Sequence, residues 1–507
     1  MSRSRRFLGG LGFAYLNQAA VMLTGLWLAR FYLAHLGQHD YGLWLTGSQL
    51  VAYLMLMDLG IVSLLPREVA YATGRAGERN PEIPDILGQS ARVVLLQTPV
   101  VALAAVLLWF TVPDAWAALR LPLCWVMVAF VATFPLRIFT ATLDGLQDLA
   151  FLGSVQFLAW GANVLTSVLL IRMGWGLGSL AVGWIAFQTI TAGSAFIRLR
   201  LRFRHVLPGA LPTLDRSQIF TFFRRGFWLS VAQVAQSLLG GTDLLILTYV
   251  MGPSVAVVYS LTGKLVNVLS NQPQLVMNAA SPAISELKAT GNHPRLLVVS
   301  ICLTRVMMIA SGMVACVVLA VNQRFVEWWV GPKEYGGFAL TCLLLAAMLV
   351  RHLNHTLVAS LICYGREKRI SITTFSDGVL TLGSSVAAIH LFGLIGAPLG
   401  SLIGASLVSV PRNLIGLAHE MHVRPTVLLR SLFPWFWRFA IAASIAQSLR
   451  HLPWLQTVPG FFVVSAGVGI GYGLFLLPLF FREPLDQYTR PLLARLRLSG
   501  LASWGAP

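Results

Sequence analysis

The chain of 507 residues is 56% hydrophobic and only 11% charged, with a mean hydropathy of +0.73 and a formal net charge of +18. Soluble domains carry about 25% charged residues, so this composition excludes a soluble globular protein and indicates a chain whose solvent is mostly lipid. The basic residues lie in short loops between apolar segments and not on one folded face, which argues against nucleic-acid binding.

Fourteen apolar segments follow one another, each near the roughly 20 residues that a tilted helix needs to cross the hydrocarbon core. The first follows a basic start like that of a signal peptide, but it continues to about Leu33 without a small-residue cleavage site, so we expect it to remain as a span. The fold class that this predicts is an all-α, polytopic membrane protein. The expected helices cover residues 7–34, 41–65, 90–111, 121–143, 150–172, 175–197, 222–250, 254–282, 298–321, 337–363, 371–391, 394–418, 432–452 and 456–481.

The basic residues alternate between successive loops. With the N-terminus in the cytoplasm, 28 of the 37 Lys and Arg fall on the cytoplasmic side, six on the outer side and three within spans. Cytoplasmic loops of membrane proteins are enriched in Lys and Arg in this way. One helix more or fewer would invert every later loop, so the bias favours fourteen spans with both termini in the cytoplasm.

A short internal repeat suggests how the spans are grouped. Leu45-Thr46-Gly47 in the second span recurs as Leu261-Thr262-Gly263 in the eighth, six spans later and therefore in the same orientation. This is the parallel-repeat plan of some transporters. We expect a six-helix lobe over 1–200, a basic cytoplasmic linker over 201–221, a second six-helix lobe over 222–420, and two additional helices with a basic tail over 421–507.

Polar residues inside the spans predict a water-filled chamber. In the eighth span they recur at three- and four-residue steps and so share one helix face. Hydrogen bonding between helices is the alternative explanation, but it needs only one or two such residues. Polar faces in the fifth, seventh, tenth and eleventh spans favour a cavity between the two lobes. The residues of the eighth-span face are Ser260, Lys264, Asn267, Asn271, Gln274 and Asn278.

The charges expected in this cavity are mostly positive. Lys264 and Arg351 lie deep in their spans, and a cation there costs about 2.5–3.5 kcal/mol unless a partner offsets it. Lys264 has Asp243 as a potential partner, whereas Arg351 has no obvious acidic partner at its depth. We therefore predict that Arg351 and Lys264 contact an anionic headgroup. The further substrate-binding candidates are Arg30, Arg305, Asn267, Asn271, Gln274, Asn354 and His355.

The acids within spans are candidates for coupling transport to Na⁺ or H⁺, namely Asp243, Asp377 and Asp58. Ordinary salt-bridge or capping roles are equally open for Asp58 and Asp377. The segment Thr262-Gly263-Lys264-Leu265 lacks the earlier glycine and the final Ser or Thr of a phosphate loop. Scattered cysteines argue against a metal site or a disulfide framework. We expect no enzyme activity and no cofactor.

Glycines at every fourth position of the twelfth span, Gly396, Gly400 and Gly404, form a ridge of small residues. Such a ridge lets two helices approach closely, so we predict close helix packing there and not a ligand site.

The stretch Leu36-Gly37-Gln38-His39-Asp40-Tyr41-Gly42-Leu43-Trp44, with Met57-Asp58-Leu59-Gly60, resembles the opening of oligosaccharide-lipid flippases. These are the polysaccharide-export branch of the multidrug/oligosaccharidyl-lipid/polysaccharide exporter (MOP) superfamily. Thr242-Asp243-Leu244-Leu245-Ile246-Leu247, followed by Gly252, Tyr259, Lys264 and Pro282, and the outer loop Glu327-Trp328-Trp329-Val330-Gly331 are also similar to theirs. The resemblance covers about residues 7–420. It departs in having fourteen spans where many members have twelve.

The resemblance implies two six-helix lobes, alternating access and a cationic central cavity. It predicts a flippase that moves an undecaprenyl-diphosphate-linked oligosaccharide, such as a polysaccharide or lipopolysaccharide O-antigen repeat unit, across a bacterial inner membrane. Its partners would be that glycan, membrane lipids and other proteins of polysaccharide assembly, and no nucleic acid. The alternatives are a cation-coupled drug or metabolite exporter of the same superfamily, and a membrane glycan polymerase or glycosyltransferase.

Overall fold

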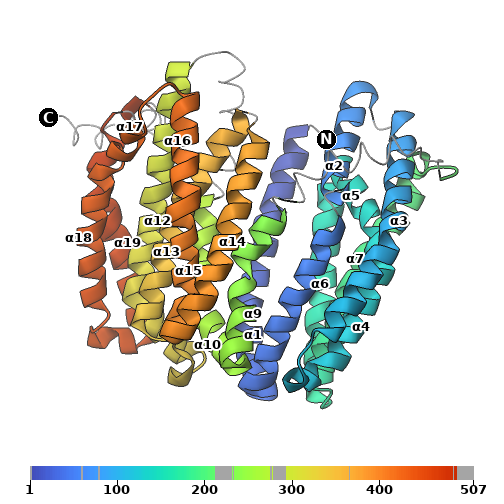
Figure 1. Cartoon of the computed structure of the whole chain (residues 1–507), viewed down its shortest axis with the longest axis horizontal. Coiled ribbons are helices and arrows are strands. Elements are labelled where there is room, and N and C mark those ends of the chain that lie inside the picture. Colours follow the sequence, from blue (N-terminus) through green and yellow to red (C-terminus); the bar gives the residue numbers. More distant parts are fainter. Residues whose placement is uncertain are drawn as a thin grey trace. The chain divides into compact units, whose positions relative to one another are not determined.

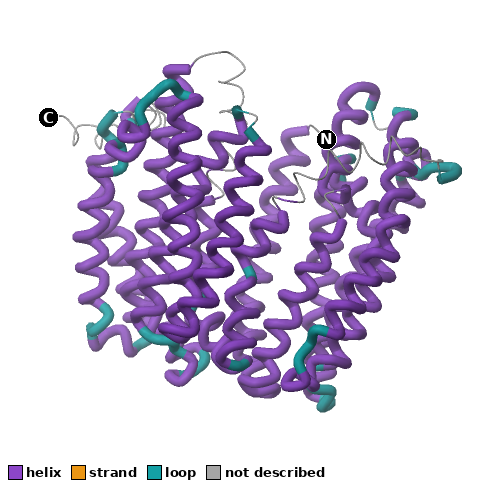
Figure 2. Tube along the Cα trace, in the orientation of Figure 1, coloured by secondary structure: helices purple, strands orange, loops and turns teal. Residues whose placement is uncertain are grey.

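The computed structural model describes residues 3–58, 61–77, 80–211, 231, 233–274, 277, 293–364, 366–483 and 485–487. These residues form helices, turns and loops and contain no strand (Figure 2). The chain divides into two compact units, Met1–Ser237 with Gly252–Ala256, and Leu238–Met251 with Val257–Pro507. The all-α fold class is therefore confirmed.

The first unit contains the predicted spans from 7–34 to 175–197 (Figure 1). Helix α1 is broken at Gly37, whose φ of 77° is in the left-handed region that favours glycine, and so it contains the first predicted span and residues 41–55 of the second. Residues 66–76, predicted to be a loop, belong to α2. The helices are α1 (Arg3–Met55), α2 (Ile61–Ala76), α3 (Glu82–Phe110), α4 (Ala117–Thr133), α5 (Arg137–Gly145), α6 (Leu149–Arg172) and α7 (Gly178–Arg202), with 3₁₀ turns at Leu56–Asp58, Asp114–Trp116, Phe134–Leu136 and Arg204–Val206.

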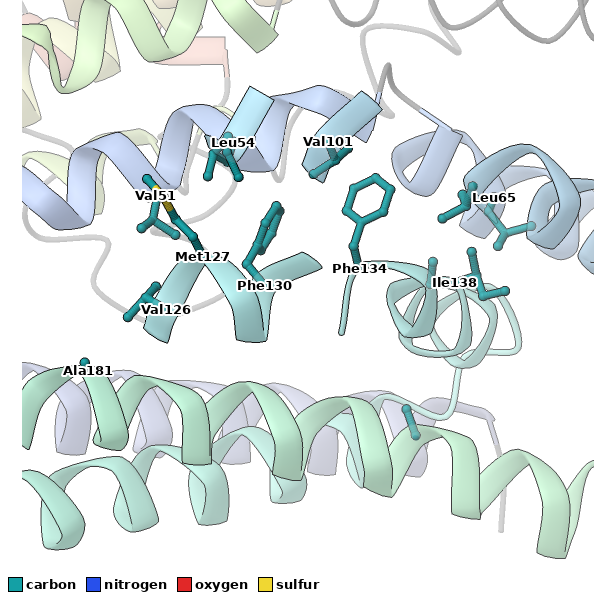
Figure 3. Close-up of a cluster of buried hydrophobic side chains, with 14 of the residues drawn as sticks. Val51, Leu54, Leu65, Val101, Val126, Met127, Phe130, Phe134, Ile138 and Ala181 are labelled. Carbon is teal, nitrogen blue, oxygen red and sulfur yellow. The ribbon is translucent and has the colours of Figure 1, made fainter. Parts of the chain in front are cut away.

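The core of the first unit is built around α4, which packs against α1, α3 and α7. Figure 3 shows this cluster of buried hydrophobic side chains. At its centre the rings of Phe130 and Phe134 meet edge to face, with centroids 5.8 Å apart, and neither side chain is exposed. Large apolar side chains outside this cluster, such as Leu103 of α3 and Leu158 of α6, are exposed. An apolar outer surface is what a helix in lipid requires.

The second unit contains the predicted spans from 298–321 to 456–481, and it shares the spans 222–250 and 254–282 with the first unit, to which residues 222–237 and 254–256 belong. Gly252 has a φ of 97° and separates the first two helices, as Gly37 divides α1. The helices are α9 (Thr242–Met251), α10 (Pro253–Thr262), α12 (His293–Trp329), α13 (Phe338–Cys363), α14 (Glu367–Phe392), α15 (Gly396–Gly404), α16 (Val410–Glu420), α17 (Pro425–Arg430), α18 (Phe433–Leu449) and α19 (Val458–Phe480), with 3₁₀ turns at Pro332–Glu334, Gly393–Ile395 and Pro453–Gln456 and a π-helical turn at Ala405–Ser409.

The last two helices, α18 and α19, pack on α12. Trp435 of α18 donates a hydrogen bond from its ring nitrogen to the Tyr472 hydroxyl of α19 at 3.1 Å and stacks on Phe439 with centroids 5.1 Å apart. Gly312 of α12 faces this group, and a Cβ atom there would meet the Tyr472 hydroxyl. The two additional helices therefore form one apolar core with α12.

Among the described residues, nine helices are long and apolar enough to cross a membrane, or ten if Gln233–Gly240 and Thr242–Met251, bent by 45°, form one span. Helices lie in all fourteen predicted ranges. One candidate span, Lys368–Glu420, covers two of them. Its 53 residues would be about 80 Å long as a straight helix, against a hydrocarbon core of about 30 Å, and it is broken at Gly393 with a φ of 63°. The chain is thus a multi-pass membrane protein, and the count of fourteen stays a prediction.

Candidate functional site

The polar face of the eighth predicted span is partly open. The chain turns at Gly263 after α10, and residues 264–274 continue as a helix. Asn267 and Asn271 are exposed, and Lys264 is half-buried. Lys264 has no hydrogen-bond or ion-pair partner within the described part of the chain, and Asn278 lies outside it. An amine and two amides on one open face suit water or a polar ligand better than hydrocarbon.

Arg351 of α13 is not available as predicted. Its guanidinium forms a bidentate ion pair with Asp377 of α14, with Nη1 2.5 Å from Oδ2 and Nη2 3.1 Å from Oδ1. It also donates to the Ser401 hydroxyl at 3.2 Å, the Ser401 carbonyl at 3.1 Å and the Thr381 hydroxyl at 3.2 Å. The expectation that Arg351 has no acidic partner was wrong. The reason for assigning Arg351 to an anionic headgroup was that expectation, so it no longer holds.

Asp377 is fully buried, and four donors satisfy its two oxygens. Besides the two guanidinium bonds, Oδ1 accepts from the Thr381 hydroxyl at 3.0 Å, and Oδ2 accepts from the Ser409 hydroxyl of the π-helical turn. A buried carboxyl group that accepts four hydrogen bonds holds its neighbours together. Asp377 thus joins α13, α14 and the turn between α15 and α16, which favours the salt-bridge role over ion coupling.

The polar face of α14 packs against the glycine ridge of α15, and the two helices run side by side (Figure 1). A Cβ at Gly400 would meet Ser385, and one at Gly404 would meet Thr381 and Asp377. The predicted close packing at this ridge is therefore confirmed. The expectation that the face of the eleventh span lines the cavity was wrong, since Asp377 and Thr381 of that face are buried against α15, and Ser384 donates to the Gly400 carbonyl of α15 at 3.3 Å.

Asp243 of α9 accepts a hydrogen bond from the Tyr259 hydroxyl of α10 at 2.8 Å. It also lies within the electrostatic range of the Arg351 guanidinium. No ion pair joins Asp243 to Lys264 in the part of the chain that the structure describes, so that alternative is not supported. Asp243 has one neutral partner and one distant cation, whereas Asp377 is saturated. Of the two acids, Asp243 is the one with oxygen lone pairs left for a proton or a cation.

The remaining candidates of α13 meet different neighbours. His352 is buried, donates from Nδ1 to the Ser311 hydroxyl of α12 at 2.6 Å, and accepts at Nε2 from the Gln274 amide at 3.2 Å. Ser311 donates its own proton to the Met307 carbonyl at 2.7 Å, so Nδ1 must be the donor to Ser311. The Gln274 NH₂ group can only donate, so Nε2 accepts and His352 is neutral. Gln274 is thus hydrogen-bonded to α13, whose His352 in turn bonds Ser311 of α12.

Asn354 accepts a hydrogen bond from the Asn413 side chain of α16 at 2.8 Å. The ring Nε2 of His355 is buried with no hydrogen-bond partner among the residues described. Asn354 and Arg351 therefore contact different helices, α16 for Asn354 and α14 and α15 for Arg351.

Arg305 of α12 has a structural position. It donates to the carbonyl of Ser431 at 2.9 Å, just before α18, and to that of Glu483 at 2.6 Å, after α19. It therefore fastens both ends of the C-terminal helix pair. Arg30 is exposed on α1 in the first unit, and the side chain of Asp58 lies outside the described residues.

Sequence reasoning missed Ser311, Ser401 and Ser409, which complete the buried polar contacts of His352, Arg351 and Asp377. A serine in an apolar segment carries no signal of this role, because its hydroxyl can equally bond the carbonyl one turn back. The π-helical turn that directs Ser409 has no sequence signature either. Tyr259 was part of the motif resemblance, and its contact with Asp243 is the role that the structure adds.

No protein-family model matches the sequence, and no curated protein matches it significantly. Solved structures do match. The structure of the lipid II flippase MurJ in an inward closed conformation superposes with a TM-score of 0.64 at 12% identity, covering 93% of this chain and 99% of that chain. The chain has the same fold as this flippase. An inward-facing multidrug resistance MATE family transporter of the MOP superfamily matches with a TM-score of 0.57 at 14% identity, covering 82% and 99%.

A eukaryotic MATE transporter also matches, with a TM-score of 0.53 at 14% identity over 87% of this chain and 99% of that chain. The MOP fold is thus shared with one flippase and with drug transporters. At such low identity the likeness concerns the arrangement of helices, and the substrate must be argued from this chain's own side chains.

Proposed function

We propose that this protein is a flippase that moves an undecaprenyl-diphosphate-linked oligosaccharide across a bacterial inner membrane by alternating access. The observation that carries the proposal is Lys264, a half-buried cation without a partner among the described residues, on a face with the exposed amides of Asn267 and Asn271. An ammonium group suits a diphosphate, and amides suit sugar hydroxyls. The MOP fold and the motif resemblance agree with this chemistry.

Asp243 is the proposed coupling acid, because of the two candidate acids whose side chains the structure describes it is the one with free acceptor capacity. Binding of H⁺ or Na⁺ there would change the charge that acts on Arg351 and so the electrostatic balance between α9 and α13. Energy would come from the ion gradient or the membrane potential, which supplies about 2.3 kcal/mol per charge per 100 mV.

A reconstituted assay tests the substrate. Purified protein in liposomes receives a fluorescent undecaprenyl-diphosphate oligosaccharide, and its movement between leaflets is followed with and without an imposed H⁺ or Na⁺ gradient. We expect Lys264→Gln to reduce flipping about tenfold, as removal of one charge-assisted contact does, and Lys264→Arg to retain most of it. Lys333→Gln, which removes an exposed lysine of the outer loop, is the matched control. Equal rates for Lys264→Gln and Lys333→Gln would contradict the assignment.

The second candidate is a cation-coupled exporter of drugs or metabolites. The match to MATE transporters and the presence of Asp243 favour it, because a cationic drug needs an acid in its pathway. A deletion strain separates the two functions. Accumulation of undecaprenyl-linked glycan facing the cytoplasm, with unchanged drug susceptibility, supports the flippase, and the opposite pattern supports the exporter.

A further inference from the structure

A basic pocket lies where α14 begins, beside α16. It has a volume of about 580 Å³ and is lined by Arg366, Lys368, Arg369, Ile372, Thr373 and Arg412. Four of these six side chains are cationic, and the described lining contains no acid. The positive-inside pattern predicts that this end of the helices faces the cytoplasm, where a bacterial membrane exposes its anionic headgroups.

The positive charge of the pocket is only partly compensated. Arg366 forms an ion pair with Glu420 at 2.8 Å. Arg369 donates to the backbone carbonyl of Arg412 at 2.9 Å, and Arg412 donates to the Ser376 hydroxyl at 3.3 Å. Within the described residues neither Arg369 nor Arg412 meets a carboxylate. Their hydrogen bonds fix the two guanidinium groups in place without neutralising them.

Two further features suit a phosphate. Among the described side chains, the N-cap residue Arg366 makes no capping hydrogen bond to α14, so the backbone N–H groups of the first turn add partial positive charge at the pocket. Ile372, a wall of the pocket, is 45% exposed and offers an apolar surface beside the cations. A water-soluble anion needs no such surface, whereas the glycerol and upper acyl carbons of a lipid do.

We propose that this pocket binds the phosphate group of an anionic phospholipid of the cytoplasmic leaflet and holds α14 and α16 at the membrane surface. The same phosphate chemistry is present in an isoprenyl diphosphate, so the test must distinguish the two lipids. The proposal does not depend on the transported substrate, because the pocket residues are separate from Lys264 and Asp243.

The test measures lipid binding to the full-length protein in detergent micelles by native mass spectrometry. The pocket variant is Lys368→Gln with Arg412→Gln, which keeps the hydrogen bond from Arg369 to the Arg412 backbone. The control is Arg424→Gln with Arg430→Gln, which removes the same charge from exposed positions on and before α17. The lipids are phosphatidylglycerol, phosphatidylcholine with the same acyl chains, and farnesyl diphosphate.

We expect the pocket variant to bind phosphatidylglycerol about 25-fold more weakly, since each basic residue near an anionic lipid contributes roughly a factor of five. Phosphatidylcholine binding and the control variant should change little. A loss confined to farnesyl diphosphate would overturn the assignment to a resident phospholipid. No loss for either anion, or an equal loss in the control variant, would overturn the phosphate site itself. Arg412→Gln against Arg424→Gln repeats the comparison with one exposed side chain each if the double variants fold poorly.

Discussion

The ion pair between Arg351 and Asp377 should stabilise the second unit strongly, and Asp377→Asn tests this. The substitution keeps the shape of the side chain but removes its charge, which leaves the guanidinium with neutral acceptors only. Asp377 is fully buried, and the Arg351 side chain is 20% exposed. Removing one partner of a buried pair costs about 3–5 kcal/mol, and the partial exposure of Arg351 places the expected loss near the lower value.

The assay is thermal unfolding of the purified protein in detergent, followed by tryptophan fluorescence. Asp377→Asn should lower the melting temperature by several degrees and reduce the amount of protein recovered from membranes. Adding Arg351→Gln should recover part of the loss, because the uncompensated charge is then gone, and the coupling energy should be about 2–3 kcal/mol. The matched control is Asp114→Asn, whose pair with Arg120 has an N···O distance of 2.7 Å but whose carboxylate side chain is 95% exposed.

Two results would refute the reasoning. Equal melting temperatures for Asp377→Asn and Asp114→Asn would mean that burial does not strengthen this pair. If the stability losses of Asp377→Asn and Arg351→Gln simply add up in the double variant, the coupling energy is zero and the ion pair does not stabilise the protein.

Two further predictions concern the packing of the second unit. Gly400→Ala should destabilise the second unit by about 1–3 kcal/mol, because the new Cβ would meet Ser385. Gly469→Ala on α19, where the new Cβ has open space, is the control and should have the melting temperature of the wild type. Equal melting temperatures for the two variants would contradict the close approach of α14 and α15. Arg305→Gln should cost about 1.5–3 kcal/mol by removing two charge-assisted bonds to backbone carbonyls, and should make the end of α19 more sensitive to limited proteolysis. Arg430→Gln, on exposed α17, is its control, and matching cleavage patterns would argue against the fastening role.

Much of the fold follows from local sequence properties. Apolar runs of the right length predicted where helices lie, because a segment in lipid must satisfy its own backbone hydrogen bonds. The ridge of Gly396, Gly400 and Gly404 predicted close helix packing, because a helix face without Cβ atoms lets any neighbouring helix approach closely. The break of α1 at Gly37 was likewise expected, as it separates the first two predicted spans.

The candidate site could be predicted less well from the sequence, because the pairing of charges depends on which helices contact each other. Arg351 and Asp377 are 26 residues apart on different helices, and nothing in either span shows that they face each other. The same uncertainty applied to Lys264, for which Asp243 was a reasonable partner until Tyr259 was found to bind that acid. Polar stripes on the eighth and eleventh spans are alike in sequence, yet one is partly exposed and the other is buried against α15.

The sequence by itself determined that this chain lies in the membrane as many helices, and it predicted their orientation, because hydropathy and loop charge are read from each segment alone. Only the tertiary structure decided which buried charges are neutralised, since a guanidinium and a carboxylate in a low dielectric interact strongly over a few ångströms and hardly at all when their helices face apart. That difference placed Arg351 in a structural ion pair and left Lys264 as a candidate substrate contact without a partner among the described residues.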